Sequence, residues 1–189
     1  MTDSTRNTSE AKLYTPSASR LATLFFSDLA ELGRFEPSAL DDLPPEHRTL
    51  LAHNEHMTVA LESFHKSPVS VEALAEWRDE TSYARCSLLS RQSDGAIVQF
   101  GMMRIWLADL PAAAQEEIAS KKSPLGRVLI EHNVLREVEL ITLWQIEPGP
   151  ILRQYLQVDG KAPLYGRTAQ ILVDERPTVQ LLEIVKLEN

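Results

Sequence analysis

The sequence has a single cysteine, Cys86, no long apolar run and no excess of basic residues. One cysteine excludes an internal disulfide framework and any multi-cysteine zinc or iron–sulfur site. No stretch approaches the roughly 20 apolar residues that a membrane-spanning helix needs. The first nine residues are polar and lack the apolar region of a signal peptide. We therefore expect a cytoplasmic protein with no stable membrane insertion.

The charge balance is acidic, with a net charge of -8 and a pI of about 5.2. A protein that binds the nucleic-acid backbone needs a basic face, so we expect no nucleic-acid partner. A small anionic ligand remains compatible, because a few arginines in a pocket can oppose the overall sign. The 189 residues, 43% of them hydrophobic, suit one domain with a substantial core. The oligomeric state stays open between monomer and homodimer.

Several catalytic motifs are missing. The sequence has no G-x-S-x-G, P-loop or dinucleotide-binding glycine pattern, so hydrolase, NTPase and Rossmann assignments lack support. His53 and His56 flank Glu55 but do not form the H-E-x-x-H zinc pattern, and we predict no metal site. Cys86 lies in a predicted strand and is expected to be a small core residue.

The order of predicted elements indicates an α+β fold. Residues 1–19 include eight Ser or Thr and no periodicity, so we expect a mobile tail followed by a single domain over 20–189. Short turns between adjacent strands favour antiparallel pairing. The periodicities predict helices at 20–32, 45–64, 110–121 and 123–132, a connector at 37–45, and strands at 69–77, 83–89, 97–107, 136–146, 168–173 and 178–187.

Glu183 interrupts an apolar strand face. Val179, Leu181, Val185 and Leu187 share that face with it at period two. A buried carboxylate is costly unless it is paired or protonated. The pattern therefore indicates either a partly wet edge strand, or a carboxyl group in an apolar pocket that suits proton transfer or hydrogen bonding to a substrate hydroxyl.

Four arginines are candidates for binding an anion. Arg85 lies in the middle of a predicted strand, where it either meets a buried anion or faces solvent, and Arg104 alternates similarly in the next strand. Arg127 follows the helix start Ser123-Pro124, which is either an ordinary start or an anion site. Arg167 belongs to a short motif that is unspecific by itself.

Taken together, these segments resemble the chorismate pyruvate-lyase family, including its chorismate-lyase-like branch. The resemblance covers about residues 50–185. It depends on the joint order of short motifs, which are Met57-Thr58, Glu62, Val69-Ser70-Val71, Tyr83-Ala84-Arg85, Phe100-Gly101, Leu110-Pro111, Pro124-Leu125-Gly126-Arg127, Tyr165-Gly166-Arg167 and Leu181-Leu182-Glu183-Ile184.

The resemblance implies an antiparallel sheet with helices packed on one side and a buried ligand cavity. It implies a carbon–oxygen lyase that eliminates pyruvate from chorismate to give 4-hydroxybenzoate, for quinone or secondary metabolism, without metal or cofactor. Arg85 would grip the aromatic carboxylate and Glu183 the ring hydroxyl, and these two would carry the catalysis. Met57 and Leu125 would contribute backbone groups to ligand binding.

Arg104, Arg127 and Arg167 complete the expected set of ligand-binding residues. The family often has G-R-T after the second hairpin strand, whereas here Gly101 is followed by Met102-Met103-Arg104. A shift of two positions keeps the arginine on the same strand face. Two alternatives to the lyase remain. One is a non-catalytic, sensor-like binder of small aromatic acids on the same fold, and the other is an enzyme acting on a different enolpyruvyl or aromatic acid.

Overall fold

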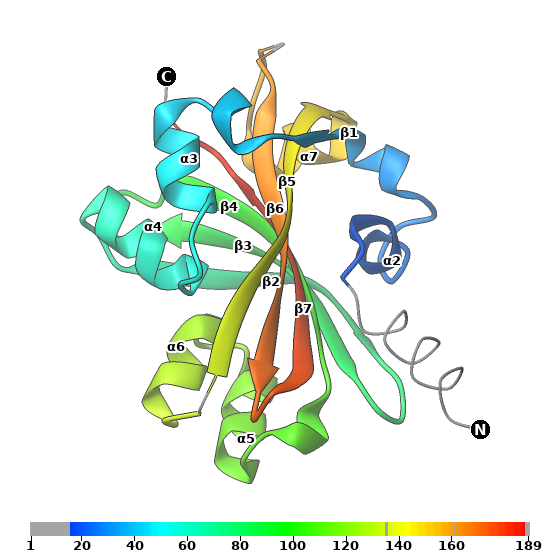
Figure 1. Ribbon diagram of the computed structural model, residues 1–189, viewed down its shortest axis with the longest axis vertical. Coiled ribbons are helices and arrows are strands. Elements are labelled where there is room, and N and C mark those ends of the chain that lie inside the picture. The colour runs from blue at the N-terminus through cyan, green and yellow to red at the C-terminus, as the bar shows by residue number, and fades with distance from the viewer. Residues whose placement is uncertain (1–15, 135, 161, 188–189) are drawn as a thin grey trace, which may run out of the picture.

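Seven strands form one antiparallel sheet in a computed structural model that describes residues 16–134, 136–160 and 162–187 (Figure 1). Every neighbouring pair is antiparallel, in the order β1-β5-β6-β7-β4-β3-β2. The predicted α+β class is confirmed. The strands are β1 (Gly33–Ser38), β2 (Val69–Arg78), β3 (Tyr83–Arg91), β4 (Ile97–Ile105), β5 (Arg136–Pro148), β6 (Leu164–Val173) and β7 (Arg176–Val185).

Helices cover both faces of the sheet. One face carries α3 (Pro45–Leu51), α4 (Met57–His65), α5 (Ala112–Ser120) and α6 (Leu125–Glu131), which is the helical layer expected from the sequence. In addition, α2 (Ala18–Ala22) and α7 (Pro150–Leu156) pack on the opposite face. Short 3-10 helices occur at Leu29–Glu31, Leu40–Asp42 and Leu107–Asp109. In Figure 1, α3, α4, α5 and α6 lie to the left and bottom, away from α2.

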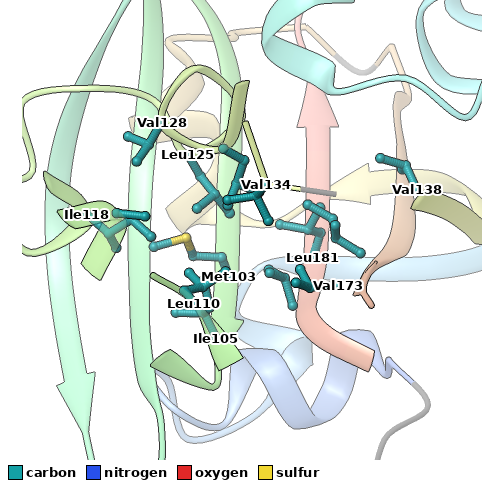
Figure 2. Packing of buried hydrophobic residues seen from close by; sticks show 14 of the residues in the cluster. Met103, Ile105, Leu110, Ile118, Leu125, Val128, Val134, Val138, Val173 and Leu181 are labelled. Carbon is teal, nitrogen blue, oxygen red and sulfur yellow. The ribbon is translucent and has the colours of Figure 1, made fainter. Parts of the chain in front are cut away.

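Apolar side chains between α5, α6 and the sheet form one part of the core (Figure 2). Leu125 and Val128 from α6 meet Met103 of β4 and Leu181 of β7 there. Cys86 is buried in the core of the opposite face, as predicted for a small core residue. No helix in the described ranges is long and apolar enough to cross a membrane.

The alternating segments are strands close to their predicted limits. In the central strands β3 and β4 consecutive residues are buried, because helices cover both faces of the sheet. The β6–β7 turn contains Asp174 and Glu175 with φ of 49° and 64°. Two adjacent left-handed residues are typical of the type I′ turns that match strand twist.

The N-terminal third differs from the prediction. The helix expected at 45–64 is split into α3 and α4, because the carbonyls of Leu51, His53 and Glu55 bond to Arg167 instead of continuing a helix. The helix expected at 20–32 ends at Ala22. Strand β1 and helix α7 were not predicted; β1 is an edge strand, a position that tolerates its Pro37.

Most of the predicted mobile tail, residues 1–15, lies outside the described residues. The remaining four positions are part of the packed chain. Pro16 is buried, and Ala18 begins α2 with 2% of its surface exposed. The packed domain therefore begins before Arg20.

Candidate functional site

A cavity lies between the α4 and α6 starts and the face of the sheet that those helices cover. The space between its lining atoms is about 590 Å³, including the part open to solvent. Most of the lining is apolar, with a few polar groups among it. The lining residues are His56, Met57, Thr58, Val71, Arg85, Ser87, Leu89, Gln99, Gly101, Met102, Met103, Pro124, Leu125, Gly126, Val138, Arg167, Ile171, Leu181 and Glu183.

Strand register places the polar groups of the floor. Ser87, Gly101, Glu183 and Arg167 form one row across β3, β4, β7 and β6. Arg85 lies in the next row, two residues along β3 from Ser87. From strand spacing and rise, the Cα atoms of Arg85 and Glu183 are about 12 Å apart. Both residues therefore face the same cavity, at separations that a small molecule can bridge with help from their side chains.

Arg85 is a buried cation with unused hydrogen-bond donors. Only 2% of its surface is exposed, and its Nε and Nη1 have no hydrogen-bond partner among the described residues. Burial lowers the pKa of Arg85, an effect that nearby Tyr83 and Glu76 oppose. An arginine nevertheless remains protonated in proteins. A buried charge with unsatisfied donors is costly, so this site favours an anion.

The carboxylate of Glu76 is already bonded to other groups. Tyr83 donates its hydroxyl to Glu76 Oε2 at 3.0 Å, and Lys121 Nζ lies 2.7 Å from Glu76 Oε1. Burial raises the pKa of Tyr83 to about 12, so the phenol remains neutral. Glu76 therefore gives no hydrogen bond to Nε or Nη1 of Arg85, and Arg85 is one of the residues that line the cavity.

Arg167 and Glu183 form a buried ion pair. Arg167 is fully buried, and its Nε lies 2.7 Å from Glu183 Oε2. Its Nη1 donates to the carbonyl of His53 at 2.8 Å, and its Nη2 donates to that of Glu55 at 3.1 Å. Most N–H groups of Arg167 thus donate to protein acceptors, and these bonds connect the floor of the cavity to the segment between α3 and α4.

Two histidines of that segment are held neutral. Burial, followed by the charges of Arg136 and Arg167, lowers the pKa of His56 to about 4. Arg136 Nε donates to His56 Nε2. Burial and the Arg167 charge also lower the pKa of His53. Among residues 16–134, 136–160 and 162–187, no group of three His, Cys, Asp or Glu side chains is arranged to hold a metal ion.

Met57 and Leu125, the other residues taken from the family resemblance, line the cavity at the first positions of α4 and α6. Gln99 also lines it but was missed by the sequence reasoning. The available signal was its position, since it shares a strand face with Gly101 and Met103.

The expectation that Arg104 binds the ligand is corrected by the structure. Arg104 points away from the cavity floor, where its Nε donates to Ser82 Oγ at 2.9 Å and its Nη2 lies 3.3 Å from Asp79 Oδ2. Its guanidinium also covers the rings of Trp77 and Trp106. Register explains this placement: Arg104 is opposite Ala84, one residue out of phase with Arg85.

Arg127 is also absent from the cavity lining. Its guanidinium pairs with Glu62 of α4, and the same Glu62 Oε1 accepts a hydrogen bond from the Val69 amide at 2.9 Å. The expected ligand contact is therefore replaced by a contact that joins α6 to α4 and to the start of β2.

No family model matches the sequence, and no curated protein matches it. The fold is similar to that of PhnF from Mycobacterium smegmatis, with a TM-score of 0.51 and 12% identity over 68% of this chain; the chain spans 62% of that protein. The effector domain of PhnF matches with a TM-score of 0.54 and 12% identity, over 70% of this chain and 88% of that domain. A GntR-family transcriptional regulator from Bacillus cereus has a TM-score of 0.42 and 12% identity, over 64% of this chain and 96% of that one.

The expectation of a carbon–oxygen lyase is wrong. The fold is similar instead to PhnF and to the PhnF effector domain, and neither name is that of a lyase. The cavity gives a physical reason as well. The carboxyl group expected to move a proton, Glu183, is neutralised by Arg167 instead of lying alone among apolar groups. The resemblance to the chorismate-lyase-like fold is supported only at the level of the fold.

Proposed function

We propose that this chain is a non-catalytic, sensor-like domain that binds a small aromatic carboxylic acid. The observation that carries the proposal is Arg85, a buried guanidinium whose Nε and Nη1 lack partners in the described part of the chain and which lines the cavity. Each of these N–H groups can donate a charge-assisted hydrogen bond to a carboxylate oxygen. The ligand supplies the missing negative charge.

The walls favour an apolar body on that acid. Val71, Leu89, Val138 and Leu181 surround the polar floor. A flat ring between such side chains removes apolar surface from water without leaving polar groups unpaired. Arg85 on β3 then orients the ring by binding the carboxylate of the ligand. Glu183 and Arg167 lie on β7 and β6, at the opposite side of the cavity floor.

Binding without chemical change fits the groups present. Glu183 Oε2 accepts a hydrogen bond from Arg167 Nε at 2.7 Å, so this carboxyl group is already paired within the protein. The similarity to the PhnF effector domain supports a role in which the bound acid is a signal. The acidic balance of the chain supports a domain that makes no direct contact with nucleic acid.

Calorimetric titration with benzoate, 4-hydroxybenzoate and 4-aminobenzoate tests the proposal. We expect Arg85→Gln to weaken binding of every acid by about 30-fold or more, because the buried charge pair is lost. Arg104→Gln is the matched control, since it removes a strand arginine that lies off the cavity, and it should bind as the parent does. Chromatography should recover each acid unchanged.

Three results would contradict the proposal: no binding of any acid by the parent protein, equal binding by Arg85→Gln, or conversion of a bound acid. Equal losses in Arg85→Gln and Arg104→Gln would also count against it, because that result indicates a general charge effect.

A further inference from the structure

Gln99 is a second buried polar group of the cavity with unused hydrogen-bonding capacity. Only 6% of its surface is exposed, it lines the cavity, and its Oε1 has no partner among the described residues. An unsatisfied buried amide oxygen destabilises the folded protein, so its presence calls for a specific reason.

The surroundings of Gln99 within the sheet do not explain a polar side chain. Its neighbours across the strands are Leu89 on β3 and Val185 on β7, both apolar and buried. An aliphatic residue would therefore suit this position of β4 better if packing alone decided it.

Gly101 shows in which direction the Gln99 amide extends. A Cβ atom on Gly101 would lie 3.0 Å from Gln99 Nε2. The amide therefore lies over Gly101, in the row of Ser87 and Glu183 and adjacent to the row of Arg85. The missing side chain at 101 leaves room for an amide directed along the cavity floor.

We infer that Gln99 Oε1 accepts a hydrogen bond from the ligand, and that the ligand is a hydroxy- or amino-substituted carboxylate rather than an unsubstituted acid. This inference rests on the proposed function, because Arg85 fixes the carboxylate and so determines which part of the ligand reaches Gln99. The donor satisfies an oxygen that has no partner in the described part of the chain. An acid without that donor keeps Gln99 Oε1 unsatisfied and binds less tightly.

The test compares matched acids on matched variants. The ligands are 3- and 4-hydroxybenzoate and 4-aminobenzoate, each measured by calorimetry against benzoate. We expect the parent protein to prefer at least one substituted acid by about tenfold or more, equal to one buried hydrogen bond. Gln99→Leu should bind benzoate at least as well as the parent does and lose that preference. In Gly101→Ala the new Cβ displaces the side-chain amide of Gln99. This variant keeps glutamine at position 99 and should still reduce the preference.

The outcomes separate the two proposals. If Arg85→Gln weakens the binding of every acid but Gln99→Leu still prefers the substituted acids, the Gln99 inference is wrong and the carboxylate site stands. If the parent protein binds the acids without any preference, the inference is also wrong. If Arg85→Gln binds as the parent does, the proposed function itself fails. Thermal unfolding of Gln99→Leu should show no loss of stability, which removes misfolding as an explanation.

Discussion

Arg167 and Glu183 face each other across β6 and β7, and the guanidinium that neutralises Glu183 also bonds the carbonyls of His53 and Glu55. One buried side chain thus connects the sheet to the turn between α3 and α4. A pair of this kind is costly to break on one side only, because the remaining charge is left in the interior.

The first prediction concerns that pair. Arg167→Met should lower the free energy of unfolding by about 3–5 kcal/mol, because it leaves the Glu183 carboxylate and three backbone carbonyls without their hydrogen-bond donor. Adding Glu183→Leu should recover part of that loss, because no charge then remains buried. Urea denaturation of the two single variants and the double variant measures the coupling. Strictly additive losses would contradict the predicted coupling.

The second prediction concerns His56. The folded protein holds the pKa of His56 at about 4, against an ordinary value of 6.5. The unfolded chain therefore binds the proton first, and stability falls as pH drops from about 7 to 4. His56→Gln should remove up to about 3 kcal/mol of that fall, from the shift alone. Because His47 and His53 also have lowered pKa values, a smaller slope should remain in the variant. Identical pH profiles for the variant and the parent protein would refute this prediction.

The third prediction concerns close strand packing at Gly166. A Cβ there would lie 2.6 Å from the Glu183 carbonyl oxygen, so Gly166→Ala must push β6 and β7 apart. We expect a loss of about 1–3 kcal/mol in the free energy of unfolding. Gly160→Ala is the control, because the nearest atom to a Cβ there is the Ala162 amide at 3.7 Å. Equal effects of the two substitutions on the thermal midpoint would show that strand spacing is not the cause.

The fourth prediction concerns Cys86. Burial raises the pKa of its thiol to about 12 and removes it from solvent. The thiolate is the reactive form, so a thiol reagent at pH 8 should label the folded protein only through unfolding. Labelling should therefore accelerate with urea in step with loss of structure. Rapid labelling without denaturant would place Cys86 at an accessible position.

The strands and the Arg85–Glu183 constellation could be predicted because alternation is local. Glu183 was visible as a polar interruption of an apolar strand face and Arg85 as an arginine in the middle of a strand, and both line the cavity. The turn between α3 and α4 could not be predicted this way. The helix is interrupted there because the backbone carbonyls accept hydrogen bonds from Arg167, which is more than one hundred residues further along the chain.

The expectation for Arg104 came from a two-position shift along β4. That shift does keep positions 102 and 104 on one strand face. Met102 is opposite Cys86 and Arg104 is opposite Ala84, however, so their face of the sheet is not the face of Arg85. A pattern along one strand cannot reveal which of its faces aligns with a given face of the neighbouring strand.

The same guanidinium that neutralises the floor of the cavity also shapes the turn above it. The turn between α3 and α4 leads directly to α4, where Val59 is 40% exposed. A single buried guanidinium therefore contacts both the floor of the cavity and a segment of the chain that reaches the surface.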